Sequence, residues 1–234
     1  MHPNVGTGKE VIAIAHRGEP LGDRENTLPA FAAAVALGAD MVELDLRRTK
    51  DDEIVVLHDQ MLDRLWGVNR SVGDLDLVEV QGIGEGDLRI PTLREVLTAV
   101  QLPLMVDFTR REVVDGALEA VLEAGAVERS LFVTGNVEAL RMLRDLTPAA
   151  RIGLTWVEGP APPLDLLEEL GAEYWNPMFG LVTPEGVEAV HDAGLKVSTW
   201  TVDEPPDMAG VVDAGVDAVV SNRIAALTAF LLRR

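Results

Sequence analysis

The sequence predicts a (β/α)8 TIM barrel with a small insertion after the second barrel strand, and three observations support this fold class. Short runs rich in Val, Ile and Leu alternate with longer helical stretches along the chain, which is typical of a parallel sheet. The 234 residues lie slightly below the roughly 250 typical of such a barrel, but within its range. No G-x-G-x-x-G loop follows the first strand, which disfavours a doubly wound open sheet. Because no linker interrupts the pattern, we expect residues 1–234 to form a single domain.

Eight short, mostly aliphatic runs are the predicted barrel strands. Their ranges are residues 11–15, 41–46, 104–108, 130–133, 152–156, 173–176, 196–202 and 218–221. After the first strand, Asn26 is placed to cap a helix that ends at Gly38. Its apolar face carries Leu28, Phe31 and Val35 at helical spacing.

The insertion is predicted between the second and third barrel strands. Residues 54–57 form one extra strand-like run beyond the eight. Residues 61–89 are polar, rich in Gly and irregular, so we interpret them as a loop or small insertion over one face of the barrel. Residues 90–93 then lead into the next helix.

Composition limits the partners and the ligands. With 20 basic and 39 acidic residues, the formal charge of -19 repels nucleic acid and anionic lipid surfaces. The absence of Cys excludes disulfides and thiolate metal sites, so a bound metal must have oxygen or imidazole ligands. The first ten residues lack the apolar core of a signal peptide, and no apolar run reaches about 18 residues. We therefore expect a cytoplasmic protein without stable membrane insertion.

Acidic and aliphatic residues alternate in the second predicted strand. Since successive side chains of a strand point to opposite faces, Glu43, Asp45 and Arg47 share one face. The aliphatic face of a barrel strand meets the helices, so both carboxylates are expected to point into the barrel. Unpaired charges there would cost several kcal/mol each, and one divalent cation would neutralise them. An inward salt-bridge network with Arg47 is the alternative.

The third predicted strand repeats this pattern. Asp107 alternates with Val106 and Phe108, so it also faces inward and is the third candidate metal ligand. Three carboxylates with open positions for substrate oxygens are typical of a catalytic site for a hard cation, either Mg²⁺ or Ca²⁺.

Two histidines end β-like runs near these acids. His16 follows the first strand, and His58 follows residues 54–57. Either one alone is more often a hydrogen-bonded core or surface residue, but a pair beside inward acids suits a general acid and a general base. Arg17 adds a planar cation that is suited to phosphate oxygens.

Tryptophans are weaker candidates for the site. Trp200 shares a strand face with Ser198 and Val202, which is equally compatible with a place at the pocket floor or wall and with core packing. Trp66, Trp156 and Trp175 could line an apolar groove for an acyl chain, although packing is the simpler interpretation.

An ordered series of motifs spans nearly the whole chain. The motifs are His16-Arg17-Gly18, Glu25-Asn26-Thr27 with Phe31, Gly38-Ala39-Asp40, Glu43-Leu44-Asp45, Thr49-Lys50-Asp51, His58-Asp59, Ile90-Pro91-Thr92-Leu93, Trp200-Thr201-Val202 and Gly215-Val216-Asp217. In this order they resemble the glycerophosphodiester phosphodiesterase family. The resemblance favours the pocket over core packing for Trp200.

This resemblance implies a TIM-barrel hydrolase that uses one divalent metal ion to cleave glycerophosphodiesters into glycerol 3-phosphate and an alcohol. It implies His16 and His58 as the acid/base pair, Glu43 and Asp45 as metal ligands, and Arg17 as a phosphate-binding residue. In the mechanism it implies, a glycerol hydroxyl attacks phosphorus to give a cyclic phosphate, which water then opens.

The sequence departs from the family pattern at four positions. Asp107 and Thr109 stand where the family usually has a glutamate and, two residues later, a lysine, and Arg47 or Arg110 could replace that lost charge. Asn222 lies in Ser221-Asn222-Arg223, where the family commonly has a Thr-Asp pair before a proline, and Asp52 stands where a turn glycine is usual after Lys50-Asp51.

These departures keep two alternatives open for function. One is the hydrolysis of another phosphodiester, as in a lysophospholipase D, and the other is a barrel that binds a phosphate ester without hydrolysing it. The sequence does not address the oligomeric state.

Overall fold

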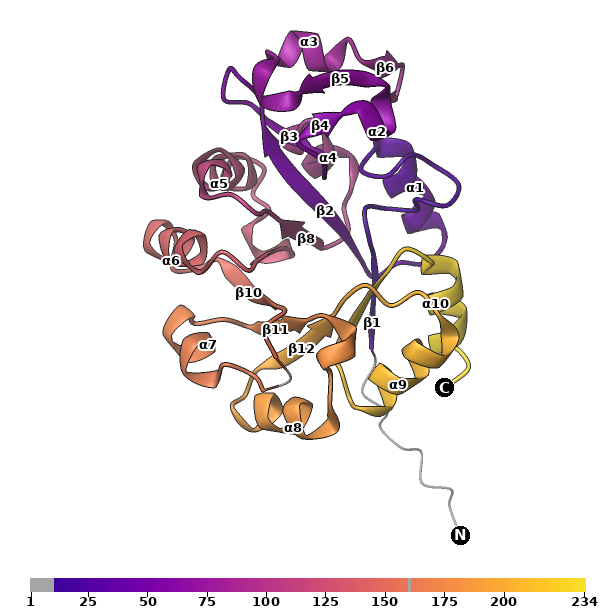
Figure 1. The fold of residues 1–234 in the computed structure, drawn as a ribbon, viewed down its shortest axis with the longest axis vertical. Coiled ribbons are helices and arrows are strands. Elements are labelled where there is room, and N and C mark those ends of the chain that lie inside the picture. Colours follow the sequence, from indigo (N-terminus) through magenta and orange to yellow (C-terminus); the bar gives the residue numbers. More distant parts are fainter. Residues whose placement is uncertain (1–10, 160) are drawn as a thin grey trace.

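The computed structural model describes residues 11–159 and 161–234 and contains the predicted closed barrel (Figure 1). Eight parallel strands pair in the order β1, β2, β8, β9, β10, β11, β12 and β13, and β13 pairs with β1 to close the barrel. Their bounds are Ile12–Ala15, Met41–Arg48, Leu104–Asp107, Ser130–Thr134, Arg151–Trp156, Tyr174–Pro177, Lys196–Thr199 and Ala218–Ser221. The fold class predicted from the sequence is confirmed.

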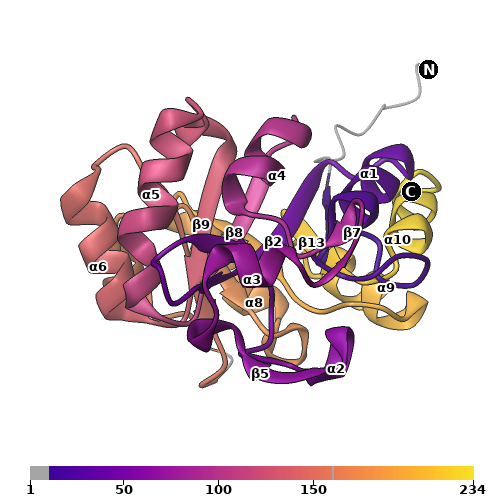
Figure 2. The ribbon, with the colours of Figure 1, turned by 90° about the horizontal axis from the view of Figure 1, so that it is seen from above.

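Helices cover the outside of the barrel (Figures 1 and 2). They are α1 (Leu28–Ala36), α4 (Leu93–Ala99), α5 (Val114–Glu123), α6 (Val137–Leu146), α7 (Leu164–Leu170), α8 (Pro184–Asp192), α9 (Pro205–Asp213) and α10 (Ile224–Leu231). Short 3-10 turns occur at Val72–Asp74, Arg111–Val113, Val127–Arg129 and Phe179–Leu181. Among the described residues, none of the helices combines the length and apolar character needed to cross a bilayer.

Strand pleating separates an outer from an inner set of side chains. In β2, Val42, Leu44 and Leu46 pack in the large apolar core that includes the helices. A smaller apolar cluster, which includes Met41 and Met105, occupies inward positions of the barrel. This alternation leaves the inward positions nearer the carboxyl ends of the strands for polar side chains.

The first helix begins one residue later than predicted. Thr27, not Asn26, is the N-cap, and its side chain accepts a hydrogen bond from the Ala30 backbone. Asn26 has a φ of 59° and turns its side chain to Asp45. Val35 is 44% exposed, so its predicted place on the apolar face is wrong, and the small buried Ala34 packs there instead. The helix ends at Ala36, and Gly38, which has a φ of 83°, follows its C-cap, as predicted.

The insertion is more ordered than predicted. After β3 (Ile54–Val56), which pairs antiparallel with β2, come β4 (Met61–Leu62), α2 (Asp63–Trp66), β5 (Val68–Ser71), α3 (Leu77–Gln81), β6 (Gly84–Glu85) and β7 (Leu88–Arg89). The two hairpins β4–β5 and β6–β7 and the two short helices surround an apolar cluster of their own, which includes Leu57, Leu62 and Val80. Such short elements, separated by turn residues, give no periodicity long enough to detect in the sequence.

Strand β12 is shorter than predicted, which changes the environment of Val202. The strand ends at Thr199 rather than at residue 202. Trp200 packs against the inner apolar cluster, whereas Val202 is buried in the outer core. The predicted shared face of Ser198, Trp200 and Val202 is therefore wrong at Val202.

Candidate active site

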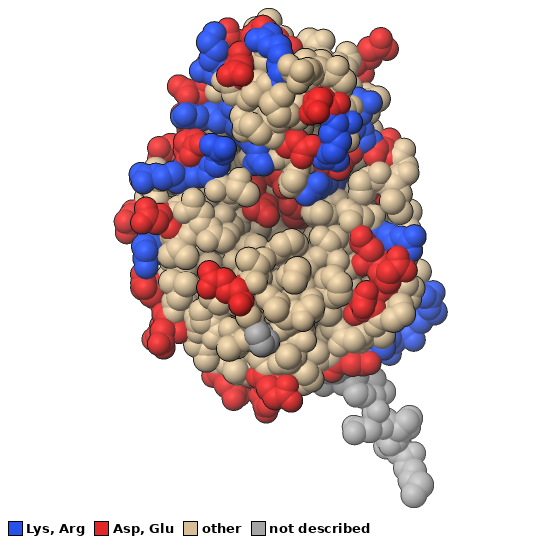
Figure 3. Space-filling view, in the orientation of Figure 1, with Lys and Arg blue, Asp and Glu red and all other residues tan. Residues whose placement is uncertain are grey.

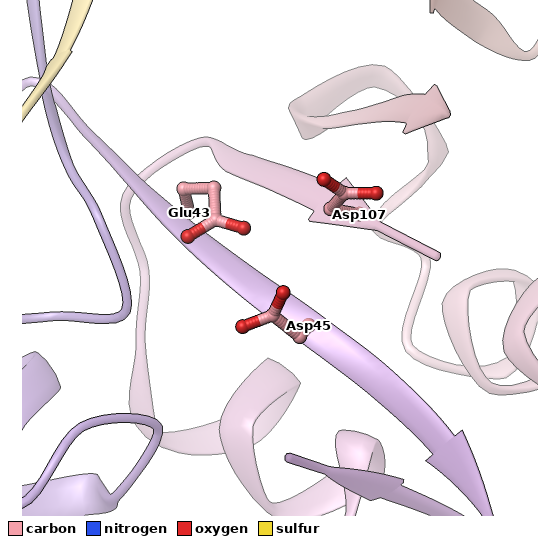
Figure 4. A group of neighbouring side chains, drawn as sticks. All are labelled: Glu43, Asp45 and Asp107. Atoms are coloured by element: carbon pink, nitrogen blue, oxygen red, sulfur yellow. The ribbon is translucent and has the colours of Figure 1, made fainter. Parts of the chain in front are cut away.

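Three carboxylates converge inside the barrel (Figure 4). Glu43 and Asp45 project from β2 and Asp107 from β8, and one oxygen of each lies within 4.8 Å of the others. Asp45 and Asp107 are register partners in neighbouring parallel strands, so their side chains point to the same side. The structure therefore brings together all three acids that strand pleating predicted to face inward, and the shorter Asp107 still reaches the group.

Burial and the repulsion of neighbouring charges raise the pKa values of Glu43 and Asp107. Burial raises the pKa of Glu43 well above its usual range, and the charges of Asp45 and Asp107 raise it further. Burial, together with the charge of Asp45, raises the pKa of Asp107 to about 7. In the apo protein, the group therefore holds protons that a cation would displace.

One guanidinium contacts these carboxylates directly. Arg17 Nε lies 3.0 Å from Asp45 Oδ2, and the Arg17 backbone N–H donates to Glu43 Oε2 at 2.9 Å. Arg47, which the salt-bridge alternative requires, directs Nη1 to the Leu46 carbonyl at 2.8 Å. Three carboxylates beside one paired guanidinium form an all-oxygen donor set with excess negative charge, which fits a hard divalent cation.

A tight turn presents Arg17 to the acids. Arg17 has a φ of 59° and Gly18 a φ of 85°. A Cβ at Gly18 would lie 2.7 Å from the backbone carbon of Ala30 in α1, so only glycine fits this close approach. From the same loop, Asn26 Nδ2 donates to Asp45 Oδ2 at 2.7 Å. The loop after β1 thus holds Asp45 from two directions.

His16 is oriented by a chain of hydrogen bonds at the other end of the sequence. Its Nδ1 lies 2.8 Å from Asn222 Oδ1, while Asn222 Nδ2 donates to Asp203 Oδ2 at 2.8 Å. Because Asn222 Oδ1 can only accept, His16 Nδ1 carries the hydrogen. Burial, with the positive charge of Arg17, lowers the pKa of His16. His16 is therefore neutral near pH 7, with a free lone pair on Nε2, which lies 3.9 Å from Glu43 Oε2.

His58 is oriented by a second chain of contacts, which ties the insertion to the loop after β1. Its Nδ1 lies 2.7 Å from Asp59 Oδ1, and Asp59 also bonds Arg64. Arg64 Nη2 lies 2.7 Å from Glu25 Oε1, which in turn accepts from Arg17 Nη1 at 3.0 Å. Hydrogen bonds from Arg64 and His58 hold the pKa of Asp59 at about 2, so Asp59 stays charged as the acceptor for His58.

The opposite wall of the barrel is polar but uncharged. Asn176 Nδ2 donates to Thr155 Oγ1 at 3.2 Å, and Ser198 Oγ donates to Asn176 Oδ1 at 2.8 Å. Trp200 is partly exposed, and its Nε1 donates to the Asn176 carbonyl at 3.0 Å. These contacts fix Trp200 beside the inner wall.

The other three tryptophans do not form an apolar groove. Trp175 is fully buried in the outer core, and Trp156 packs against the same core. Trp66 lies in the insertion, where the Arg24 guanidinium stacks 4.4 Å from its ring centre. Packing, the simpler interpretation from sequence, accounts for all three.

Three residues near the histidines had no role assigned from the sequence. Asp203 accepts a hydrogen bond from Asn222, Glu25 accepts one from Arg17, and Arg64 pairs with Asp59. Glu25 lies within one of the motifs that carry the family resemblance, and Asp203 directly follows another. No other feature of the sequence marked these residues. The contact between Glu25 and Arg64 joins two loops that are 39 positions apart in the sequence, so no local pattern predicts it.

The comparisons with known proteins identify the family. Residues 16–226 match the model of the glycerophosphoryl diester phosphodiesterase family. A glycerophosphodiester phosphodiesterase from Caldanaerobacter subterraneus is 32% identical over 229 residues, which cover 91% of this chain and 94% of that protein. The chain belongs to the glycerophosphoryl diester phosphodiesterase family. The predicted family, and with it the predicted class of phosphodiester hydrolase, is confirmed.

Solved structures agree on the fold. A putative glycerophosphoryl diester phosphodiesterase from Silicibacter pomeroyi superposes with a TM-score of 0.86 at 24% identity, covering 99% of this chain and 95% of that one. A phosphodiesterase from Oleispira antarctica, solved in complex with the product sn-glycerol-3-phosphate, gives a TM-score of 0.87 at 22% identity, covering 94% and 96%. At these identities, the likeness bears on the fold alone.

Proposed function

We propose that the protein hydrolyses glycerophosphodiesters to glycerol 3-phosphate and an alcohol, with one Mg²⁺ or Ca²⁺ held by Glu43, Asp45 and Asp107. The observation that carries this proposal is the position of His16, whose free Nε2 lies beside three converging carboxylates. The bound cation would polarise a phosphoryl oxygen and the attacking hydroxyl, which offsets the charge that develops in the displacement. A cytoplasmic location is part of the same proposal.

His16 acts as the first proton acceptor. Its Nδ1 hydrogen is committed to Asn222 and its ring is neutral, so Nε2 can take the proton of the attacking glycerol hydroxyl. Asp203 holds the Asn222 amide in the orientation that this tautomer needs. The hydroxyl oxygen then bonds to phosphorus.

His58 acts as the first proton donor. Its Nδ1 is engaged by Asp59, so Nε2 is the atom that passes a proton to the leaving alcohol as the bond from phosphorus to that alcohol breaks. In the second step, His58 accepts a proton from water, which opens the cyclic phosphate, and His16 returns its proton to the glycerol oxygen. Both histidines are restored, and the products are glycerol 3-phosphate and the free alcohol.

Arg17 and Trp200 bind the substrate. Arg17 carries a positive charge next to Asp45, and its planar guanidinium would bind the phosphoryl oxygens of the substrate. Trp200 offers a partly exposed indole that is held by the Asn176 carbonyl, against which the glycerol carbons can pack. The relative from Oleispira antarctica, with its bound sn-glycerol-3-phosphate, supports a small-molecule substrate.

The test is product release from a defined diester such as glycerophosphoethanolamine. We expect glycerol 3-phosphate to form with Mg²⁺ or Ca²⁺, to stop forming after chelation and to return when the metal is restored. Turnover that chelation does not change would overturn the role of the metal. Intact diester across a panel of headgroups and metals would favour the alternative, a barrel that binds a phosphate ester without hydrolysing it.

A further inference from the structure

A pocket of about 220 Å³ lies between the end of β2, the insertion and the loop after β8, and its lining begins at Leu46, the residue after Asp45 in β2. Its lining includes the four cations Arg47, Arg48, Lys50 and Arg110, and the two carboxylates Asp52 and Glu112. The pocket is thus net positive, although the whole chain carries a formal charge of -19. Figure 3 shows basic side chains gathered where the insertion meets the barrel, in the upper half of that face.

Arg47 connects this pocket to the carboxylate group. It follows Asp45 by two positions on the same face of β2, and its Nη1 lies 3.5 Å from Thr109 Oγ1, just beyond Asp107. Its Nε is buried and has no hydrogen-bond acceptor among the residues that the structure describes. A buried guanidinium N–H without an acceptor favours an anion at this position.

The other cations of the pocket are held by weak contacts. Arg48 Nη1 lies 3.1 Å from Asp52, Lys50 Nζ lies 3.5 Å from Asp76, and each of these pairs is exposed. Arg110 pairs with its near neighbour Glu112 at 3.4 Å, also at the surface. Exposed pairs of this kind contribute little to stability, so a ligand can replace them at small cost.

Arg47 and Arg110 line the same pocket and carry like charges, so they repel one another there. An anion bound between the two guanidinium groups would remove this repulsion. Thr109 is small and uncharged, and Arg47 Nη1 lies next to its hydroxyl. Arg47 therefore supplies the positive charge between the pocket and the carboxylates.

We propose that this pocket is the leaving-group subsite, and that it selects diesters whose alcohol bears an anion of its own, a phosphate or a carboxylate. The inference rests on the proposed hydrolysis, because it assigns the position of the alcohol that this reaction releases. The glycerol phosphoryl group lies at the three carboxylates, and the second anion lies among Arg47, Arg48 and Arg110.

The kinetic test compares three glycerophosphodiesters whose leaving alcohols are 2-phosphoethanol, ethanol and choline. We expect kcat/KM to be at least about tenfold higher for the diester of 2-phosphoethanol than for the diester of ethanol. The diester of choline should have the lowest kcat/KM. The double variant Arg48→Glu/Arg110→Glu should lower the ratio of kcat/KM for the diester of the anionic alcohol to kcat/KM for the diester of the neutral alcohol to about 1 or below. If the double variant keeps the preference, the subsite is overturned.

The matched control is Arg141→Glu/Arg144→Glu, with the same change in charge on α6. Arg141 pairs with Glu169 on α7, away from the pocket. This control should keep the preference of the wild type. An equal loss in the control would mean that long-range repulsion sets the preference, and it would also overturn the subsite.

A binding measurement separates this inference from the proposed reaction. We would titrate 2-phosphoethanol into protein freed of divalent ions over a chelating resin, by isothermal titration calorimetry. We expect the double variant to bind about tenfold more weakly than the wild type. Hydrolysis without such binding overturns the subsite alone. Binding without hydrolysis of any diester overturns the proposed reaction, and with it the leaving-group role of a pocket that still binds the anion.

Discussion

The inner wall of the barrel has a charged half and a neutral half. The charged half, at β1, β2 and β8, carries His16, Glu43, Asp45 and Asp107. The neutral half, at β10, β11 and β12, carries Thr155, Asn176 and Ser198, with Trp200 just beyond.

The two halves differ in what their polar groups still need. In the neutral half, Asn176 is hydrogen-bonded to Thr155 and to Ser198, so these polar side chains serve as one another's hydrogen-bond partners. In the charged half, three carboxylates share one ion-paired guanidinium, and the pKa values of Glu43 and Asp107 are raised. We assign the cation and the chemistry to the half that leaves charge uncompensated, and we assign the shaping of the cavity to the other half.

The largest effect is expected from the histidines of the charged half. His16→Ala and His58→Ala should each lower kcat by about 10²–10⁴-fold, because each removes one proton transfer. The rate of glycerol 3-phosphate release measures this loss, and circular dichroism checks the fold. His191→Gln, on α8, is the matched control and should retain activity. Comparable losses in His191→Gln would contradict the assignment.

The next effect is expected from the carboxylates themselves. Without a cation, Asp107 binds a proton more tightly in the folded chain, with its pKa raised to about 7, than in the unfolded chain. The free energy of unfolding should therefore fall as pH rises from about 4 to about 7. Mg²⁺ replaces the proton and removes this loss, so it should raise the melting temperature more at pH 8 than at pH 5.

Asp107→Asn sharpens this measurement. Its uncharged amide should flatten the fall in melting temperature with pH and weaken the Mg²⁺ effect. Asp115→Asn, at the start of α5, is the matched control and should behave like the wild type. An Mg²⁺ effect in Asp107→Asn equal to that of the wild type would argue against Asp107 as a ligand.

A smaller effect is expected at the residues that orient His16. Asp203→Ala removes the acceptor that fixes the Asn222 amide, so we expect about a tenfold loss of kcat with KM nearly unchanged. The ¹⁵N chemical shifts of the His16 ring should show the Nδ1–H tautomer in the wild type and a mixture in the variant. The conservative Asp203→Glu should recover part of the activity. An unchanged tautomer in Asp203→Ala would contradict the positioning role.

The smallest effect is expected in the neutral half. Ser198→Ala removes the donor to Asn176 and should cost about 1–2 kcal/mol of stability, measured by urea unfolding. Its kcat should stay within about threefold of the wild type, since no charge or proton transfer is lost. A loss of kcat as large as that of the histidine variants would remove the distinction between the two halves.

The charged half could be predicted well from the sequence. Strand pleating alone fixed the inward direction of Glu43, Asp45 and Asp107, and parallel pairing of neighbouring strands then brought them together. The carboxyl ends of barrel strands meet at one end of the barrel, which is why His16 also arrives there.

The remaining features depend on loops and could not be predicted in the same way. The tautomer of His16 is set by Asn222, which lies 206 positions away in the chain. The Asn26 side chain bonds Asp45 because its backbone has a positive φ, a conformation that its position in the sequence did not reveal. The insertion was predicted to be irregular because its helices and strands are only two to five residues long.

The most direct test of the account is a crystal structure with Mn²⁺ in place of Mg²⁺, with the ion located by its anomalous scattering. We predict one strong peak inside the barrel, about 2.0–2.6 Å from an oxygen of each of Glu43, Asp45 and Asp107. A barrel interior without a peak, or an ion bound without these three carboxylates, would contradict the central claim that the charged half is a metal-dependent catalytic centre.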